Sequence, residues 1–487
     1  MYALSYSFHP LRWENTLNSR TSAVYEPIKL IGYRRMARSG ISPVFERIVV
    51  SAFMKKKYTK ILFASVLAFG AITLAHGQQS RDVLTVDQAV DEAIKHNLDF
   101  LAQKYDLSVA EAQIVTAKLR PNPLLTLDAD HLDLLGTGFT TAGTNPNNGG
   151  PVEYSVRGDY LYERGGKRQA RTALAVGNRD VTRLSLADSV RGLILTVQGA
   201  FVDVLNAKQS LQLAQENLKT FQDIVTINQT RFKDGDIAQV ELMRSEVAEL
   251  QYANAVRQAQ LQEVSALSRL QLLLGRTPLQ PIDVQGDLRE DFPDGTREAL
   301  FNLALQDRPD LQALVRDEGR ADADLRLQKA NGKVDWQIGA EYRRQTVTAQ
   351  ANTLGFFVQS PVALFNRNQG EIARAQQALL QAQARSRAMK ATVQNDVDQA
   401  FLQYQASRDT LQNVERSMLG KAKDVRSISD YAYKRGEISL VEFIDAVRAY
   451  NDTMQTYNDA RAGYARSLYG LDAATGSTTA AGKVPLP

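Results

Sequence analysis

The sequence contains no cysteine in its 487 residues. Disulfide bridges and thiolate metal sites are therefore excluded, and so is a lipid attached to an N-terminal cysteine. Histidine is scarce: His9 and His76 lie near the N-terminus, and His96 and His131 are isolated from each other. There is no cluster of histidines and carboxylates, no Gly-rich phosphate loop and no nucleophile motif. The sequence predicts no cofactor, no metal site and no enzymatic activity.

Proline is also rare, with none between Pro151 and Pro278 or between Pro361 and Pro485. Because proline breaks the interior of a helix, both stretches permit very long helices. They are rich in Ala, Gln, Leu and Arg and poor in glycine, which favours helix over a compact mixed domain. A helix from Gln169 to Lys233 would extend roughly 95 Å. We predict a mainly α-helical protein.

The basic charge is concentrated at the N-terminus. Residues 1–77 hold eleven Lys or Arg against three Glu, a net of +8, so the remaining residues carry about −4 and call for no nucleic-acid partner. Three lysines after Met54 precede an apolar run from Ile61 to Leu74 and small residues up to Gly77. This pattern predicts a signal peptide at 54–77, because the run is shorter than the roughly 20 residues of a spanning helix. We expect residues 1–53 to be an extension from a start codon placed too early.

One motif occurs twice, about 200 residues apart. Its matched pairs are Phe232 and Tyr433, Gly235 and Gly436, Ile237 and Ile438, Val240 and Val441, and Glu241 and Glu442. Upstream, apolar residues recur in steps of three and four from Val197 to Phe232 and from Val397 to Ala432. A period of 3.5 residues kept over about five heptads is typical of coiled coils. We predict an internal tandem repeat with copies at 78–278 and 295–475, a linker at 279–294 and a flexible tail at 476–487.

Each copy also contains two segments in which apolar and polar residues alternate. They span about 123–132 and 152–163 in the first copy, and about 334–346 and 353–365 in the second. Membrane β-strands need about 9 to 11 such residues, with one face toward lipid. Four strands are too few for a closed barrel, which starts at about eight, and open edges in lipid would leave backbone groups unpaired. Protomers must therefore pool their strands, and three copies would give twelve.

Short motifs at strand entries and helix ends carry a family resemblance. They are Ala93 to Leu98, Ala304 to Leu311, Arg120 to Pro123, Leu274-Gly275, Tyr469 to Leu471, and Tyr433-x-x-Gly436 with Glu442 and Asp445. With the order of segments, they make the chain resemble the TolC-like outer-membrane factors of tripartite efflux systems over nearly all of residues 84–475. The segment from Phe365 to Ala373 resembles the heavy-metal cation-efflux branch of that family.

The resemblance implies a homotrimer with a twelve-stranded β-barrel in the outer membrane and a long coiled-coil helical barrel in the periplasm. It implies three partners besides the other protomers: a periplasmic adaptor protein, an inner-membrane pump and outer-membrane lipid. The expected function is passive conduction of the substrates that the pump exports, with metal cations as the cargo of the branch.

The two glycine turns are the first candidate site. Gly235-Asp236 and Gly436-Glu437 lie between heptad-patterned helices, where glycine gives the backbone freedom that a tight reversal needs. A plain helix C-cap accounts for both glycines. The resemblance implies in addition that the turns form the periplasmic tip and the adaptor-docking surface.

The second candidate site is a pore aperture formed by Tyr433, Glu442 and Asp445. Glu442 and Asp445 are three residues apart and share one helix face. The resemblance implies that acidic residues here line the narrow entrance, and six carboxylates around a threefold axis would attract cations. The alternative is a solvated helix face. The hydroxyl of Tyr433 can brace a closed tip by a hydrogen bond.

Two other functions fit the same patterns. One is the outer-membrane duct of a type I protein-secretion system, which a neighbouring gene for an ABC exporter would indicate. The other is a soluble periplasmic coiled-coil scaffold, which predicts extraction from cells without detergent, whereas the paired strands predict a membrane fraction.

Overall fold

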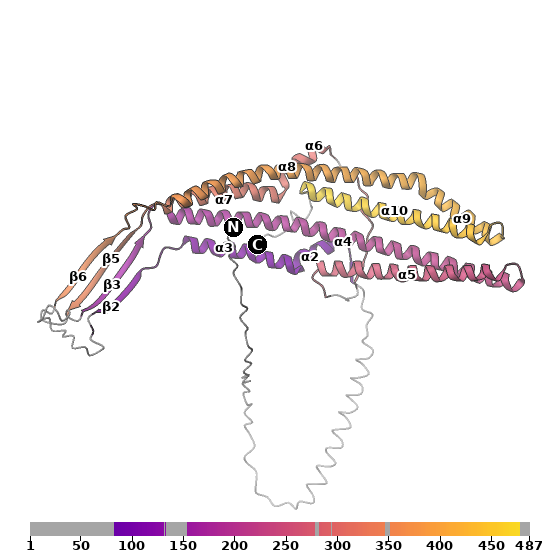
Figure 1. Ribbon diagram of the computed structural model, residues 1–487, viewed down its shortest axis with the longest axis horizontal. Helices are drawn as coiled ribbons and strands as arrows, with labels where there is room; N and C mark the ends of the chain where they lie inside the picture. Colours follow the sequence, from indigo (N-terminus) through magenta and orange to yellow (C-terminus); the bar gives the residue numbers. More distant parts are fainter. Residues whose placement is uncertain are drawn as a thin grey trace, which may run out of the picture. The chain divides into compact units, whose positions relative to one another are not determined.

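The computed structural model describes residues 82–130, 132, 153–277, 282–293, 295–345 and 351–477. The predicted extension at 1–53, the signal peptide at 54–77 and most of the tail at 476–487 lie outside these residues. The chain divides into two units, 1–79 and 80–487, and every described element belongs to the second (Figure 1).

The described unit is mainly helical, as predicted. Its first half contains α2 (Val86–His96), α3 (Leu98–Lys118), α4 (Lys167–Asp234) and α5 (Gln239–Leu273). Its second half contains α6 (Arg297–Asp307), α7 (Pro309–Asn331), α8 (Gln369–Asn413), α9 (Gly420–Arg435) and α10 (Leu440–Thr475). The long helix expected from the absence of proline is α4, with 68 residues. Both halves run in one order: two shorter helices, two strands, a long helical stretch, a turn and another helix (Figure 1).

Four antiparallel strands form one sheet in the order β2 (Leu124–Asp130), β3 (Glu153–Tyr162), β5 (Trp336–Gln345) and β6 (Asn352–Gln359), so β2 and β6 are its edges. The strand predicted at 353–365 is therefore too long, because it ends at Gln359. The reason is Pro361, which has no amide hydrogen to donate to a strand ladder.

The strand register places apolar side chains on one face of this sheet. Val156, for example, lies opposite both Leu127 and Tyr342. The face comprises Leu125, Leu127, Ala129, Tyr154, Val156, Tyr160, Tyr162, Trp336, Ile338, Ala340, Tyr342, Leu354, Phe356 and Val358. The opposite face is polar, and there Ser155 bonds to Asp128 and Gln337 to Asp159. In the described part of the chain no helix covers the apolar face, where Phe356 is 79% exposed.

Two short strands that the sequence did not predict join the two halves of the unit. β1 (Asp82–Leu84) and β4 (Ile282–Val284) pair in parallel. β4 lies within the predicted linker at 279–294, so part of that linker is regular structure. Each strand has only three residues, which is too short for an alternating pattern to be recognised.

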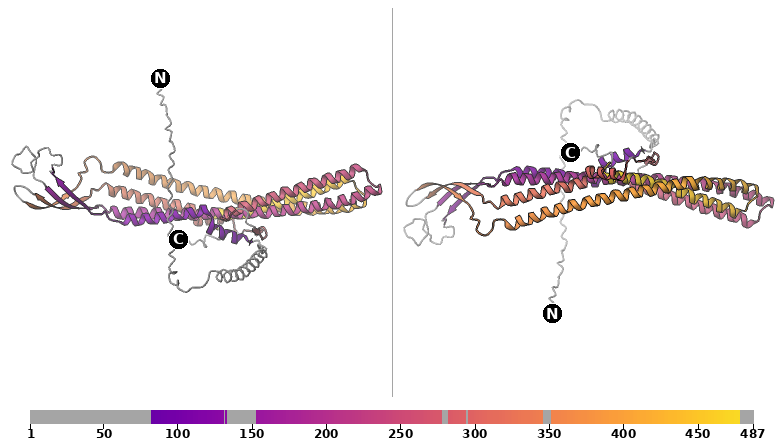
Figure 2. Two further views of the ribbon diagram at one scale, coloured as in Figure 1. Left: turned by 90° about the horizontal axis from the view of Figure 1, so that it is seen from below. Right: turned by 90° about the horizontal axis from the view of Figure 1, so that it is seen from above.

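The helices pack side by side, with α4 in contact with α3, α5, α7 and α10 (Figure 2). Near the two turns, these helices form a row in the order α5, α4, α10 and α9, and side chains of α4 and α9 also contact each other directly. Among the described helices, only α4 is long and apolar enough to cross a membrane by composition. Its buried residues Val197, Phe201 and Val204 belong to a core that it shares with neighbouring elements, which explains its apolar composition.

The second long helical stretch is interrupted by a π-helical segment at Val414–Leu419, between α8 and α9. The predicted seam is buried up to Val414, but Met418, Val425 and Ile428 are 41%, 47% and 66% exposed. A π-helix holds more residues per turn than an α-helix, so it rotates the following residues out of the seam. The prediction of one uninterrupted seam from Val397 to Ala432 is therefore wrong at Met418, Val425 and Ile428, whereas Ala432 at its end is buried.

The C-terminal end of α10 is held by two arginines, one on α4 and one between α6 and α7. Arg191 on α4 donates a 2.7 Å hydrogen bond to the carbonyl oxygen of Ala473, and Arg308 donates one of 3.5 Å to Ala474. Arg308 also pairs with Asp310 at 2.6 Å and with Asp396 at 2.9 Å. Cations at a helix C-terminus satisfy its free carbonyl groups and its partial negative charge.

Candidate functional site at the two helix turns

The two turns that the sequence predicted as the tip have the same backbone geometry. Gly235 (φ 84°) caps α4 and Gly436 (φ 78°) caps α9, both in the left-handed region that favours glycine. The amide of Asp236 donates to the carbonyl oxygen of Arg231 at 2.8 Å, and that of Glu437 donates to Ala432 at 2.9 Å. These are Schellman-type caps, which explains why the same motif appears twice in the sequence.

The two turns are joined by Arg231. Its guanidinium donates to the carbonyl oxygens of Tyr433 at 3.3 Å and of Lys434 at 2.6 Å. It thereby satisfies two carbonyls at the end of α9 from a position on the last turn of α4. This side chain therefore links the two turns directly.

Tyr433 is buried beneath the turns. Its hydroxyl donates a 2.8 Å hydrogen bond to Oδ1 of Asn228 on α4, and both side chains are almost completely inaccessible. Its ring stacks on Phe443 of α10 at a centroid distance of 5.1 Å. Burial raises the pKa of Tyr433 above its ordinary value, although the hydrogen bond with Asn228 lowers it. The hydroxyl therefore remains a protonated donor at physiological pH.

Glu442 has a structural role that we did not predict. Its Oε2 accepts hydrogen bonds from the amide (2.8 Å) and the hydroxyl (3.0 Å) of Ser439, and the amide of Glu442 donates to that hydroxyl. This is a capping box at the start of α10. The hydrogen bonds from the Ser439 backbone and side chain lower the pKa of Glu442, so its carboxylate is charged at physiological pH.

Asp445 lies one turn beyond Glu442, and both side chains are exposed. Asp445 forms an ion pair with Arg448 at 3.8 Å, a contact that the sequence did not predict. The carboxylate of Glu437 pairs with Arg435 at 3.0 Å, and Asp236 is exposed. The structure thus places the predicted tip and aperture residues within one end of the helix row.

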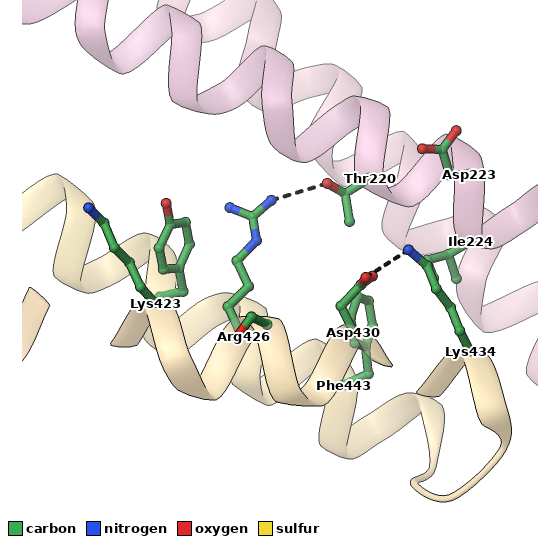
Figure 3. Close-up of a pocket in the computed structure, with 10 residues that line it drawn as sticks. Thr220, Asp223, Ile224, Lys423, Arg426, Asp430, Lys434 and Phe443 are labelled. Atoms are coloured by element: carbon green, nitrogen blue, oxygen red, sulfur yellow. Dashed lines mark hydrogen bonds and ion pairs between the residues drawn. The ribbon is translucent and has the colours of Figure 1, made fainter. Parts of the chain in front are cut away.

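A cavity of about 400 Å³ lies beside this end, between α4 and α9 (Figure 3). Arg426 extends from α9 to the hydroxyl of Thr220 on α4 at 3.2 Å, with its guanidinium over the ring of Tyr450. Lys434 pairs with Asp430 at 2.7 Å. Cationic side chains predominate along the α9 side of the cavity, which makes this part of the junction between α4 and α9 polar.

Asn228, Arg231 and Ser439 are the residues that sequence reasoning missed. Asn228 stood in the apolar seam as a polar member, which is the available signal for a buried hydrogen bond. Ser439 and Glu442 have the spacing of a capping box, so this role was recognisable. Arg231 gave no signal, because its partners are backbone carbonyls of a helix 200 residues away.

No three His, Asp or Glu side chains come together as a metal site in the residues that the structure describes. A sheet with one bare apolar face, joined to paired long helices that end in two matched turns, defines the architecture of outer-membrane efflux channels. Comparison with known proteins agrees with this class.

The outer membrane efflux protein family model matches residues 89–276 and 300–477. The cobalt-zinc-cadmium resistance protein CzcC of Cupriavidus metallidurans is 26% identical over 371 residues, covering 75% of this chain and 83% of the relative. The pyoverdine export outer membrane protein OpmQ of Pseudomonas putida is 25% identical over 389 residues, covering 75% and 80%.

Solved structures share the fold. The Campylobacter jejuni outer membrane channel CmeC has a TM-score of 0.68 at 16% identity, covering 80% of this chain and 85% of that one. CusC has a TM-score of 0.67 at 18% identity, covering 80% and 92%. The chain belongs to the outer membrane efflux protein family, whose members are channels and not enzymes.

Proposed function

We propose that three copies of this chain form a channel through the outer membrane, with a twelve-stranded barrel in the lipid and a helical tunnel in the periplasm. The channel conducts passively the substrates that an inner-membrane pump delivers through a periplasmic adaptor protein. The observation that carries this proposal is the bare apolar face of the four-stranded sheet. Leu127, Phe356 and Val358 on that face are each more than two-thirds exposed.

An apolar face of this extent favours a lipid environment over water. In lipid, however, the unpaired backbone groups of β2 and β6 would each cost several kcal/mol. Pairing β6 of one copy with β2 of the next satisfies both edges and leaves the polar face toward the lumen. The same reasoning argues against a soluble coiled-coil scaffold, because such a protein would expose this apolar face to water.

At the other end, the two turns are the proposed docking surface for the adaptor, through Gly235, Asp236, Gly436 and Glu437. The proposed aperture is lined by Glu442 and Asp445, with Tyr433 as its internal brace. Support comes from the matched caps and the hydrogen bonds of Arg231, which link both turns into one unit. An adaptor that binds the turns would therefore act on both helix pairs at once.

For the exported substrate we propose metal cations. The relative CzcC, whose name refers to cobalt, zinc and cadmium resistance, supports this, as do the acidic residues at the proposed aperture. A strain from which this chain is deleted should grow poorly in cobalt, zinc or cadmium and be rescued by the intact gene. Unchanged metal tolerance, with reduced export of pyoverdine, would instead favour an activity like that of OpmQ.

The central test uses the absence of cysteine, which gives a background free of native thiols. Thr126→Cys on β2 and Thr353→Cys on β6 place one thiol on each sheet edge. Cells expressing residues 54–487 with both substitutions are fractionated and treated with a short thiol-specific crosslinker. We expect the protein in the outer-membrane fraction and covalent dimers and trimers on a denaturing gel.

Each single-cysteine variant is the matched control and should give no trimer, because one edge then lacks its thiol. A soluble monomer without crosslinked species would overturn the proposed channel. A membrane monomer that never forms a trimer would overturn the pooled barrel.

A further inference from the structure

A basic cavity lies where the sheet meets the helices. Its volume is about 570 Å³, and it is lined by residues ahead of β2, at the end of β3 and at the start of α4. Four cationic side chains line it: Arg120, Arg164, Lys167 and Arg168. The carboxylate among its lining residues is Glu163. The cavity is thus strongly biased toward an anionic occupant.

The acidic groups nearby are already neutralised. Arg171 holds the carboxylate of Glu163 with two hydrogen bonds, of 2.7 and 3.3 Å. Lys167 pairs with Asp335 at 2.7 Å. Within the described residues, Arg120, Arg164 and Arg168 have no carboxylate partner, so their charges are available to a ligand.

The cavity adjoins the apolar face of the sheet, and Leu161 from the opposite face also lines it. Tyr160 and Tyr162 line it, and both lie on that face. The guanidinium of Arg164 lies 4.4 Å from the ring centroid of Trp336, which is also on that face and 6.5 Å from the ring of Tyr162. Aromatic rings with adjacent cations are the usual composition of a protein surface at the level of lipid head groups.

The start of α4 adds to the positive potential. Its N-cap is Gly166, which has no side chain to accept the free amide hydrogens, and its first turn carries no acidic residue. Lys167 and Arg168 stand there instead, where the partial positive charge of a helix N-terminus disfavours cations. An anion in the cavity would offset the repulsion between these two cations and the helix N-terminus.

We propose that this cavity binds the head-group phosphate of an anionic phospholipid in the periplasmic leaflet of the outer membrane. Arg120, Arg164 and Arg168 contact the phosphate, while Tyr160, Tyr162 and Trp336 lie against the upper acyl chains. This assignment rests on the proposed function, because it requires the sheet to lie in the outer membrane. The bound lipid fixes the depth of the barrel in a chain that has no cysteine for a lipid anchor.

The test is native mass spectrometry of the detergent-extracted full assembly, titrated with phosphatidylglycerol, with phosphatidylcholine or with inorganic phosphate. We expect up to one retained phosphatidylglycerol per protomer and weaker retention of phosphatidylcholine. Arg120→Gln with Arg168→Gln should weaken phosphatidylglycerol binding roughly 20- to 30-fold, because each basic residue at an anionic surface contributes about a factor of five. Arg183→Gln with Lys219→Gln on α4, outside the cavity, removes the same charge and should leave binding unchanged.

Equal affinity of the double variant and the wild type would overturn the site. Equal retention of phosphatidylcholine would exclude recognition of anionic lipid, and displacement of the lipid by inorganic phosphate would assign the cavity to free phosphate. If the Gln variant does not assemble, Arg120→Lys with Arg168→Lys replaces it. This variant should bind the lipid and release it as the salt concentration is raised. Lipid binding that does not depend on salt would contradict the proposal. A trimer in the outer-membrane fraction without bound anionic lipid overturns this inference alone, whereas a soluble chain overturns the proposed function.

Discussion

The hydroxyl of Tyr433 on α9 donates a 2.8 Å hydrogen bond to the side-chain oxygen of Asn228 on α4, across 205 residues of sequence. Both side chains are buried, and Nδ2 of Asn228 has no partner of its own. The hydrogen bond therefore pairs the buried oxygen of Asn228 with the buried hydroxyl of Tyr433. It links α9 to α4 immediately beneath the turns.

Tyr433→Phe should destabilise the tip by about 1 to 3 kcal/mol, because the oxygen of Asn228 is left buried without a donor. Thermal unfolding of the detergent-extracted protein gives the stability change, and single-channel conductance should show longer open periods. Tyr431→Phe is the control, since Tyr431 is 59% exposed on the same helix. Adding Asn228→Leu to Tyr433→Phe should recover part of the loss, and a purely additive double variant would contradict this account of the hydrogen bond.

Two glycines of the α9 region should respond in opposite directions to alanine. Gly436→Ala forces a Cβ onto a residue at φ 78°, and we expect a loss of about 1 to 2 kcal/mol. Gly420→Ala lies in helical backbone with no atom within 4 Å of the new Cβ, and we expect a gain of up to about 1 kcal/mol. Denaturation midpoints measure both, and equal shifts would show that backbone conformation is not the cause.

Removal of the acidic charge at the proposed aperture should reduce cation selectivity. Glu442→Gln is the suitable change, because glutamine retains the capping box with Ser439 whereas alanine would also destabilise α10. With Asp445→Asn, the reversal potential across a bilayer under a salt gradient should move toward the non-selective value. Glu246→Gln, on an exposed position of α5, is the charge control, and an identical shift there would show a general effect of net charge.

Asp310 should make the protein sensitive to acid. Burial alone would raise the pKa of Asp310, but hydrogen bonds and charges from Arg308 and Arg191 outweigh burial and lower it. The contribution of Asp310 to the free energy of unfolding is therefore complete above the pKa of the unfolded state, near 3.9. It is lost as pH falls through the lower pKa of the folded state. Asp310→Asn should cost about 3 kcal/mol near neutral pH, and the difference from the wild type should narrow below about pH 4.

Circular dichroism during heating, at several pH values, measures this difference. Asp322→Asn is the control, because Asp322 forms an exposed ion pair with Arg326 that contributes little. A difference for Asp310→Asn that stays constant from neutral to strongly acidic pH would show that its charge is not the cause.

Features with a repeating pattern could be predicted from the sequence. The two turns follow from Gly235 and Gly436, and the apolar face of the sheet follows from alternation such as that from Trp336 to Tyr342. The features that were missed depend on single long-range contacts. Asn228 was visible only as a polar lapse in the seam, and the π-helical segment at Val414–Leu419 leaves the apolar spacing intact while it rotates the helix.

The same distinction between local patterns and long-range contacts applies to the strands. Proline is a local signal, and Pro361 indicates a strand end near Gln359 even though the alternation of apolar and polar residues continues beyond it. The pairing of β1 with β4 depends on contacts between segments 200 residues apart, and three-residue strands carry no pattern of their own.

The free edges of β2 and β6 have a genetic consequence in the proposed assembly. Insertion of the sheet and association of the copies must occur together, since a lone sheet in lipid leaves both edges unsatisfied. A copy with a damaged edge but intact helices would still be recruited into a ring, where it would leave the facing edge of one wild-type neighbour unpaired and the barrel open. Alleles that disrupt β2 or β6 should therefore be dominant when expressed beside the wild-type gene, whereas alleles that prevent helix packing should be recessive.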